Sequence, residues 1–444
     1  MKYVIIGGDA AGMSAAMQLL KYDKDAEITV LERGTIYSYG QCGLPYVVSG
    51  EIESVDKLIS RSVHTFRDKY GIDARTNCQV NKVNAESKTV DGVDTISGAP
   101  FSIYYDKLLV ASGADPFMPG WDGSDLPGVY ALKTIPDAES IMEYMKQGVQ
   151  DVTIVGGGYI GLEMAEGFST AGMQVRLLNR SAYVGKIFDE DMAEHIHEET
   201  AKQRIDLHLN EDVQKIIGTD QVEKIQTDKG EYSTDLVLVA TGVSPNTAFL
   251  EGTGIATGMK GAIQVNGFME TNVPDVYAAG DCALHYHKVK KEYDFIPLGT
   301  TANKQGRIAG MNMAGVSREF KGIAGTSILK FMDLSLGKTG LTEKEASTLK
   351  LPYEAVTVQG KDIAGYYPNA KTTYVKLVYR TDDLLLLGGQ VIGEKGVDKR
   401  VDVLATALFM DMKVTDFEDV DLSYAPPYNG VWDPIQRAAR KANR

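Results

Sequence analysis

The chain opens with the stretch Tyr3-Val4-Ile5-Ile6-Gly7-Gly8-Asp9-Ala10-Ala11-Gly12, an apolar run followed by a turn rich in glycine. Residues 13–20 predict a helix after the turn, and residues 28–31 predict a second strand that ends at Glu32. This order, with an acidic residue about twenty positions after the last glycine, is typical of a dinucleotide-binding βαβ unit. Asp9 replaces the middle glycine, so a glycine turn without a ligand is the alternative interpretation.

A second copy of the pattern favours the ligand. Residues 152–155 lead into Gly156-Gly157-Gly158-Tyr159-Ile160-Gly161, followed by an expected helix at 162–170 and a strand at 174–178. Here Asn179-Arg180-Ser181 replaces the acidic residue, and Arg180 could pair with a 2′-phosphate or be a solvated loop residue. We therefore expect two dinucleotides, a flavin and a nicotinamide, with NADPH tolerated or preferred at the second site.

Further segments indicate interleaved domains. Residues 105–114 and 235–242 are apolar strands that end in small residues, and residues 276–281 bring another strand to Asp281, which could bind a flavin ribityl hydroxyl. The pattern changes to strands and turns from about Phe320. The predicted fold is α/β, with two Rossmann-like dinucleotide-binding domains and a C-terminal α+β domain. The expected limits are 1–112 and 244–319 for the first domain, 113–243 for the second and 320–444 for the third.

Composition limits the possible partners. The chain has 444 residues, a formal charge of −14 and three cysteines. The negative charge disfavours nucleic acids and anionic membranes, and no apolar run is long enough to span a bilayer. Because the cysteines are few, we expect a cytoplasmic protein. Because a strand begins directly after Met1 and Lys2, we expect no signal peptide. No metal site is expected.

Cys42 is the residue that suggests redox chemistry. It lies in Ser38-Tyr39-Gly40-Gln41-Cys42-Gly43-Leu44-Pro45-Tyr46, and the next cysteine is Cys78. Because no neighbouring cysteine can close a disulfide, a sulfur partner must come from outside the chain. The options are a mixed disulfide with a small thiol, or a sulfenic acid.

With these motifs in order, the whole chain resembles the pyridine nucleotide-disulfide oxidoreductases. The single-cysteine stretch resembles the branch of coenzyme A disulfide reductases, NADH oxidases and NADH peroxidases. Gly365-Tyr366-Tyr367-Pro368 and Ser423-Tyr424-Ala425-Pro426-Pro427-Tyr428 resemble coenzyme A disulfide reductases in particular. The resemblance implies FAD, NADPH or NADH, a C-terminal dimerisation domain, a homodimer, and coenzyme A disulfide as substrate.

The resemblance also implies roles for individual residues. Cys42 would carry coenzyme A as a mixed disulfide, while Tyr367 and Tyr424 of the other subunit would donate protons; the alternative is that both tyrosines pack a dimer interface. Tyr159 would be a lid over the flavin, and Glu163 would face the nicotinamide or be a solvated helix residue. The implied cofactor contacts are Gly7, Gly8, Asp9, Ala10, Ala11, Gly12, Glu32, Arg33, Ala111, Ser112, Gly113, Gly280, Asp281, Thr300, Thr301 and Ala302 for the flavin, and Gly156, Gly158, Tyr159, Ile160, Gly161, Glu163, Asn179, Arg180 and Gly242 for the nicotinamide dinucleotide.

Coenzyme A carries phosphates, so its site needs cations and amide partners. The candidates are Lys21, Tyr22, Ser38, Gln41, Arg61 and Lys69, with Lys399 and Arg400 as weaker ones, and each of the cations could simply be solvated surface.

The expected function is therefore reduction of coenzyme A disulfide to two thiols by NAD(P)H through Cys42. The alternatives are an NAD(P)H oxidase or peroxidase, a polysulfide or persulfide reductase, and a non-catalytic redox sensor. Oxidases and peroxidases of this branch carry a histidine in the first glycine loop, where this chain has Asp9-Ala10-Ala11. That difference weighs against them.

Overall fold

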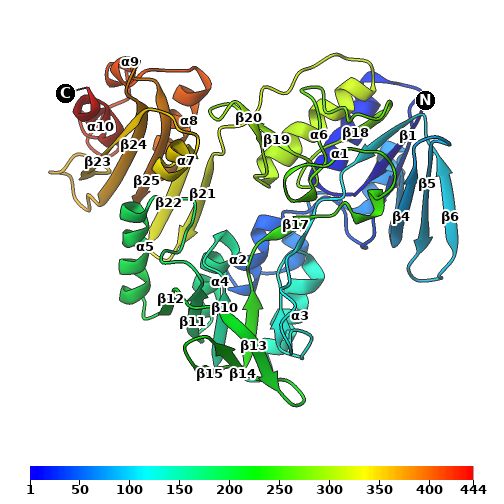
Figure 1. Cartoon of the computed structure of the whole chain (residues 1–444), viewed down its shortest axis with the longest axis horizontal. Helices are drawn as coiled ribbons and strands as arrows, with labels where there is room; N and C mark the ends of the chain where they lie inside the picture. Colours follow the sequence, from blue (N-terminus) through cyan, green and yellow to red (C-terminus); the bar gives the residue numbers. More distant parts are fainter. Residues whose placement is uncertain (444) are drawn as a thin grey trace.

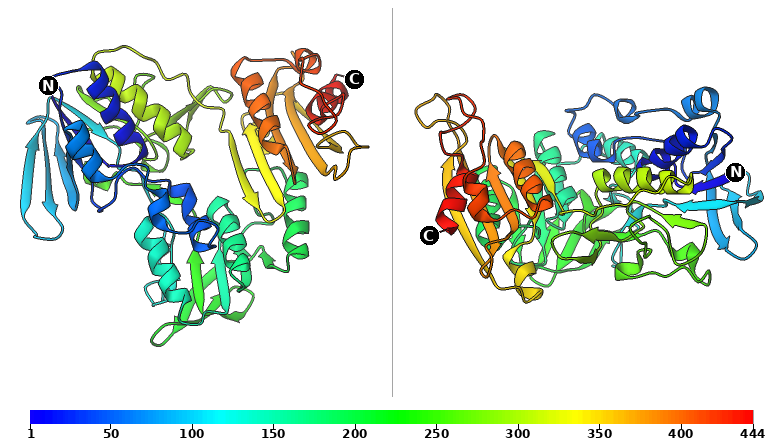
Figure 2. Two further views of the ribbon diagram at one scale, coloured as in Figure 1. Left: turned by 180° about the vertical axis from the view of Figure 1, so that it is seen from behind. Right: turned by 90° about the horizontal axis from the view of Figure 1, so that it is seen from above.

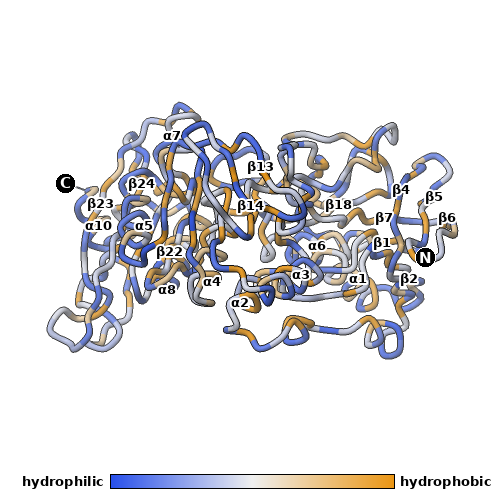
Figure 3. Tube along the Cα trace, turned by 90° about the horizontal axis from the view of Figure 1, so that it is seen from below, coloured by the Kyte–Doolittle hydropathy of each residue, from blue (hydrophilic) through white to orange (hydrophobic). Residues whose placement is uncertain are grey.

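Two parallel sheets and one antiparallel sheet, each of five strands, form three lobes (Figure 1). The computed structural model describes residues 1–443. The N-terminus lies in the first lobe and the C-terminus in the third, at opposite ends of the molecule (Figures 1 and 2). Hydrophobic and hydrophilic stretches interleave along the whole trace instead of gathering at one end (Figure 3).

The first lobe is built on a sheet of order β18-β7-β1-β2-β3, in which all neighbours are parallel. Helices α1 and α6 pack side by side on it, although almost 300 residues separate them in sequence (Figures 1 and 2). The elements are β1 (Lys2–Ile6), α1 (Ala10–Tyr22), β2 (Glu27–Leu31), β3 (Asp73–Arg75), β7 (Lys107–Val110), β18 (Val276–Ala278) and α6 (Gly299–Met313), with an antiparallel sheet of β4 (Cys78–Asn84), β5 (Thr89–Asp94) and β6 (Pro100–Tyr104). Shorter elements are β19 (His285–His287), β20 (Glu292–Asp294), the 3-10 turns η1 (Gln41–Gly43), η2 (Val55–Leu58), η4 (Ala248–Leu250) and η5 (Met259–Gly261), and a π-helical turn η3 (Thr65–Lys69). Helix α2 (Leu44–Val48) follows η1 and packs against the second lobe.

The second lobe repeats this plan with a parallel sheet of order β12-β11-β10-β16-β9. Its elements are β9 (Val129–Tyr130), α3 (Ile135–Met145), β10 (Asp151–Val155), α4 (Tyr159–Thr170), β11 (Gln174–Asn179), α5 (Glu190–Lys202), β12 (Asp206–Leu209) and β16 (Leu236–Val239), with an antiparallel sheet of β13 (Val213–Gly218), β14 (Val222–Thr227) and β15 (Glu231–Ser233). The βαβ units expected after both glycine loops are therefore present.

The chain passes between the first two lobes twice, at β8 (Ala114–Pro116) and β17 (Val243–Pro245). The two segments pair with each other as antiparallel strands. The expected limits at residues 112 and 243 fall beside this pair. The domain limits themselves stay predictions.

The third lobe is the antiparallel sheet β21-β22-β25-β24-β23 with helices against it (Figure 1). Its elements are β21 (Ser327–Phe331), β22 (Leu334–Gly340), α7 (Glu343–Thr348), β23 (Tyr353–Lys361), β24 (Thr372–Arg380), β25 (Leu386–Gly393), α8 (Val397–Phe409), α9 (Val414–Glu418) and α10 (Pro434–Ala442). The predicted α/β fold with a C-terminal α+β domain is confirmed. Among the described helices, none has the length and apolar character needed to cross a bilayer.

Arg400, on α8, is a buried cation of the third lobe. Its Nε lies 3.0 Å from Oδ1 of Asp433, the residue that caps α10, and both side chains are at most 2% exposed. Its Nη2 donates to the Asp362 carbonyl at 2.8 Å, and it also contacts Asn429. Arg400 thus ties together the two loops that carry the exposed tyrosines. Because these bonds occupy its guanidinium, Arg400 is not free to bind a phosphate, and the expectation that it binds coenzyme A is wrong. Neighbouring Lys399 donates a hydrogen bond to the Tyr428 carbonyl.

Replacing Arg400 with Met is expected to lower the free energy of unfolding of the third lobe by about 3–5 kcal/mol, because it leaves the Asp433 carboxylate buried without its partner. Chemical denaturation followed by circular dichroism measures this change. Lys395→Met, on an exposed neighbouring position, is the matched control. A loss below roughly 1 kcal/mol for Arg400→Met would mean that the ion pair does not support this lobe.

Candidate active site

The two glycine loops have the same close backbone approach. A Cβ placed on Gly12 would lie 2.0 Å from the Gly7 carbonyl oxygen, and one placed on Gly161 would lie 1.9 Å from that of Gly156. Since any larger residue would collide with backbone, each glycine lets its helix begin directly against the preceding strand. The N-termini of α1 and α4 are thereby positioned for a pyrophosphate.

The residue at the end of the following strand braces each loop. Glu32 accepts hydrogen bonds from the backbone N–H of Gly8 and of Gly34, both at 2.8 Å. Asn179 is buried, and its Oδ1 accepts from the N–H of Gly157 at 3.2 Å while its Nδ2 donates to two carbonyls of the next loop. Asn179 thus supports the second loop as Glu32 supports the first, but without a negative charge.

A single cavity of about 3060 Å³ extends from the first glycine loop past the second to the third lobe. Most of the expected site residues line it, namely Gly7, Gly8, Asp9, Ala10, Ala11, Glu32, Arg33, Gln41, Cys42, Ala111, Ser112, Gly113, Gly158, Tyr159, Ile160, Glu163, Arg180, Gly242, Gly280, Asp281, Thr300 and Ala302. Gly12, Gly156, Gly161, Asn179 and Thr301 are not among the lining residues. The elements that the sequence separates widely are therefore brought to one site.

Cys42 lies on η1 and is exposed, whereas Cys78 and Cys282 are buried. Asp9 fixes the Cys42 segment to the first glycine loop: its carboxylate accepts from the Tyr39 backbone N–H at 3.1 Å and from Gln41 Nε2 at 2.9 Å. Burial raises the pKa of Asp9 to about 6. The residue that replaces the middle glycine thus connects the loop to the reactive thiol.

The surroundings of Cys42 disfavour its thiolate. Enclosure by the surrounding protein raises the pKa of Cys42, and the Glu163 carboxylate raises it further, while the Lys133 ammonium acts in the opposite direction. Glu163 is itself partly desolvated, which raises its pKa to about 7. Lys133 Nζ lies 3.2 Å from Asp281 Oδ2 in the cavity wall. Lys133 was not expected at the site, because nothing in its local sequence distinguishes it from a surface lysine.

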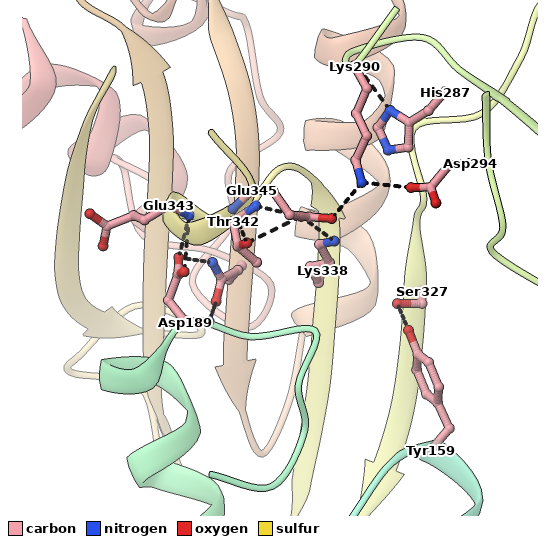
Figure 4. Close-up of polar contacts among 11 residues, drawn as sticks. Tyr159, Asp189, His287, Lys290, Asp294, Ser327, Lys338, Thr342, Glu343 and Glu345 are labelled. Atoms are coloured by element: carbon pink, nitrogen blue, oxygen red, sulfur yellow. Dashed lines mark hydrogen bonds and ion pairs between the residues drawn. The ribbon is translucent and has the colours of Figure 1, made fainter. Parts of the chain in front are cut away.

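Tyr159 points from the start of α4 to the third lobe (Figure 4). Its hydroxyl donates to Ser327 Oγ of β21 at 2.6 Å. Figure 4 also shows a charged network between the first and third lobes, in which Lys290 contacts Asp294 at 2.6 Å and Glu345 at 2.9 Å. Neither Ser327 nor this network was expected from the sequence.

The expected tyrosines lie away from the cavity of their own chain. The hydroxyl of Tyr424 lies 3.1 Å from that of Tyr366, and no such contact involves Tyr367 within the described residues. All three side chains are exposed, Tyr366 most of all at 76%. Tyr366, which was not among the expected site residues, therefore lies beside Tyr424. The roles expected for Tyr367 and Tyr424 stay predictions.

The expected coenzyme A cations also lie outside the cavity lining. Arg61 and Lys69 face the Tyr70 ring at 5.8 and 5.5 Å from its centroid, and the Lys21 ammonium lies 4.9 Å from the ring centroid of Tyr22. The Ser38 carbonyl accepts from the backbone of Ser60. Of the six candidates, only Gln41 reaches the cavity wall.

Residues 1–306 match the model of the pyridine nucleotide-disulphide oxidoreductases, and residues 326–434 match the dimerisation domain of the same proteins. The chain belongs to this family. It is therefore an NAD(P)H-dependent flavoprotein disulfide oxidoreductase, with FAD and a nicotinamide dinucleotide as cofactors. The resemblance seen in the sequence is confirmed.

Three relatives illustrate the range within the family. An NAD(P)H sulfur oxidoreductase (CoA-dependent) of Pyrococcus abyssi is 41% identical over 98% of this chain and 97% of its own length. A coenzyme A disulfide reductase of Staphylococcus aureus is 31% identical over 99% of both chains. The solved structure of reduced Bacillus anthracis CoADR-RHD superposes with a TM-score of 0.97 at 34% identity, covering 100% of this chain and 80% of the other.

The residues present fit both cofactors. Gly12 and Gly161 open the two helix N-termini, and the neutral Asn179 leaves the second site without the acidic group that opposes a 2′-phosphate. When bound, FAD supplies the electron-pair transfer between the nicotinamide and a disulfide.

Replacing Glu163 with Gln is expected to increase the rate of Cys42 alkylation by iodoacetamide at pH 8 by roughly two- to fivefold, since removing a nearby negative charge lowers the pKa of the thiol. The effect should fade below pH 7, where Glu163 is protonated in the parent enzyme. Rates measured on the reduced holoenzyme between pH 6 and 9 test this, with the exposed Glu143→Gln as control. A variant slower than the parent at pH 8 would contradict it.

Proposed function

We propose that this chain reduces coenzyme A disulfide with NAD(P)H through a Cys42–S–S–CoA mixed disulfide, as a homodimer. The observation that carries the proposal is the exposure of Cys42 in the cavity while Cys78 and Cys282 are buried. Since no second thiol of the described chain is available, the disulfide that Cys42 forms must include an external sulfur.

The chemistry balances in two exchanges. The Cys42 thiolate attacks one sulfur of coenzyme A disulfide, forming Cys42–S–S–CoA and releasing one coenzyme A thiolate. Two electrons, supplied ultimately by NAD(P)H, then cleave the mixed disulfide to the Cys42 thiolate and a second coenzyme A thiolate. Overall, one coenzyme A disulfide, one NAD(P)H and one proton give two coenzyme A thiols and NAD(P)⁺.

The electrostatics of the site support a resting state in which the Cys42 sulfur is part of a disulfide. Enclosure and the Glu163 carboxylate both penalise a thiolate at Cys42. Neither penalises a neutral disulfide. The mixed disulfide therefore avoids a cost that the free thiolate bears.

The proposed proton donors come from the other subunit. Tyr424 stays a candidate, and the hydroxyl contact with Tyr424 favours Tyr366 over Tyr367 as the second tyrosine. Both are exposed, as a site completed by dimerisation requires. Among the expected cations, Arg61 and Lys69 are the candidates for binding the coenzyme A phosphates, because both lie at the Tyr70 ring.

A polysulfide or persulfide is the second candidate substrate. The relative from Pyrococcus abyssi, a CoA-dependent sulfur oxidoreductase, supports it. Any such sulfur chain offers Cys42 a sulfur that its thiolate can attack.

Oxidase and peroxidase chemistry is less favoured, because Ala10 stands in the first glycine loop and no histidine occurs before His64. A cytoplasmic location stays a prediction.

NADPH is the proposed reductant. Beyond the neutral Asn179, the exposed Arg180 and Lys186 both line the cavity after β11, where a 2′-phosphate would lie. Glu190 and Glu194 also line this region. Because their carboxylates would repel a phosphate, Arg180 and Lys186 are the groups that would recognise it.

The intact mass of the protein, denatured without reductant, is expected to exceed that of the chain by one coenzyme A. The excess should disappear with dithiothreitol and be absent from Cys42→Ser. A gain of one oxygen atom, or a free thiol, would instead favour oxidase or peroxidase chemistry. Release of coenzyme A together with turnover of coenzyme A disulfide separates an enzyme from a sensor, which would be reduced only once.

Replacing Arg180 with Ala is expected to raise KM for NADPH by roughly ten- to a hundredfold, because a charged hydrogen bond to the 2′-phosphate is lost. KM for NADH should stay unchanged, which makes NADH the internal control. Steady-state kinetics with both dinucleotides measures the difference. Equal losses for NADPH and NADH would show that Arg180 does not read the 2′-phosphate.

A further inference from the structure

The hydrogen bond between Tyr159 and Ser327 joins two lobes across the cavity. Tyr159 is the first residue of α4 and Ser327 the first residue of β21, and the Tyr159 hydroxyl donates to Ser327 Oγ at 2.6 Å (Figure 4). Both residues are half-buried and both line the cavity. The contact therefore fixes the direction of the Tyr159 ring within the site.

Ser327 belongs to β21, which pairs with β22 of the same lobe. It pairs with Lys338 of β22, and the neighbouring Thr326 and Thr339 hydroxyls lie 2.7 Å apart. Lys338 in turn contacts Glu345, which holds Lys290 beside the first lobe (Figure 4). Because Ser327 is held in place, movement of the Tyr159 ring has to break their hydrogen bond.

The lobes do not need this bond to stay together. Glu166, two turns further along α4, is buried, accepts from the Met332 backbone N–H at 2.9 Å and pairs with the Lys330 ammonium. These contacts join α4 to the end of β21 independently. What remains specific to Ser327 is the orientation of Tyr159.

Tyr159 directly follows the second glycine loop and lines the cavity that reaches both loops. A dinucleotide with its pyrophosphate at the N-terminus of α4 extends its nicotinamide past the first residue of that helix. Glu163, one turn further, and Cys42 line the cavity beyond it. The hydrogen bond to Ser327 holds the Tyr159 side chain at the start of α4, where such a nicotinamide would pass.

We propose that Ser327 is a positioning residue that holds Tyr159 across the nicotinamide path, so that binding of the dinucleotide breaks the Tyr159–Ser327 hydrogen bond. This inference rests on the use of NAD(P)H in the proposed function. It assigns to the third lobe a direct influence on cofactor binding at the second.

The test is the Kd of NADP⁺ for the oxidised holoenzyme, measured by calorimetry with NAD⁺ in parallel. Ser327→Ala is expected to lower Kd by about two- to tenfold, because binding no longer has to break a hydrogen bond. Tyr159→Phe should have a similar effect, and the double variant should show no further change. Ser327→Thr, which keeps the hydroxyl, should restore the parent value.

Lys330→Ala is the matched structural control. It should lower the melting temperature by loosening α4 from β21 and leave the Kd unchanged. An unchanged or raised Kd in Ser327→Ala, or additive effects of Ser327→Ala and Tyr159→Phe, would overturn the inference while leaving the proposed function intact. A parent enzyme that binds neither NADP⁺ nor NAD⁺ would overturn both.

Discussion

The close backbone approach at the two glycine loops is the constraint on which the site depends. Because nothing larger than hydrogen fits at Gly12 and Gly161, α1 and α4 start directly against their strands, and their N-termini open into one cavity. Asp9 then extends the first loop to the Cys42 segment through Tyr39 and Gln41. A repeated local geometry thereby places two helix ends and one thiol at fixed relative positions.

The local part of this arrangement could be predicted from sequence, since it depends on residue types at short spacing. Both βαβ units and the positions of Glu32 and Cys42 follow from such patterns. The contacts of Lys133, Ser327 and Tyr366 could not be predicted, because each depends on a partner more than fifty residues away in sequence. Asn179 shows what a sequence pattern cannot predict. It was expected to bind the dinucleotide, but its hydrogen bonds to the backbone of the second loop and of the loop after β11 depend on how the chain folds.

Ion pairs join the lobes in an acidic protein. Lys376 of the third lobe lies 2.6 Å from Asp191 and 3.5 Å from Asp189 of the second, and it also pairs with Glu343. Its side chain is only 4% exposed, so salt screens these contacts weakly. The cations buried between lobes thus offset the repulsion that the surplus of carboxylates would otherwise cause.

The pairing of β8 with β17 has a consequence for how the protein can change. The two points where the chain leaves and re-enters the first lobe lie side by side in one short ladder. The second lobe is therefore an insertion with neighbouring ends, and closing such a loop costs little conformational entropy. A lineage could alter or exchange this inserted lobe, while the first lobe keeps its own sheet.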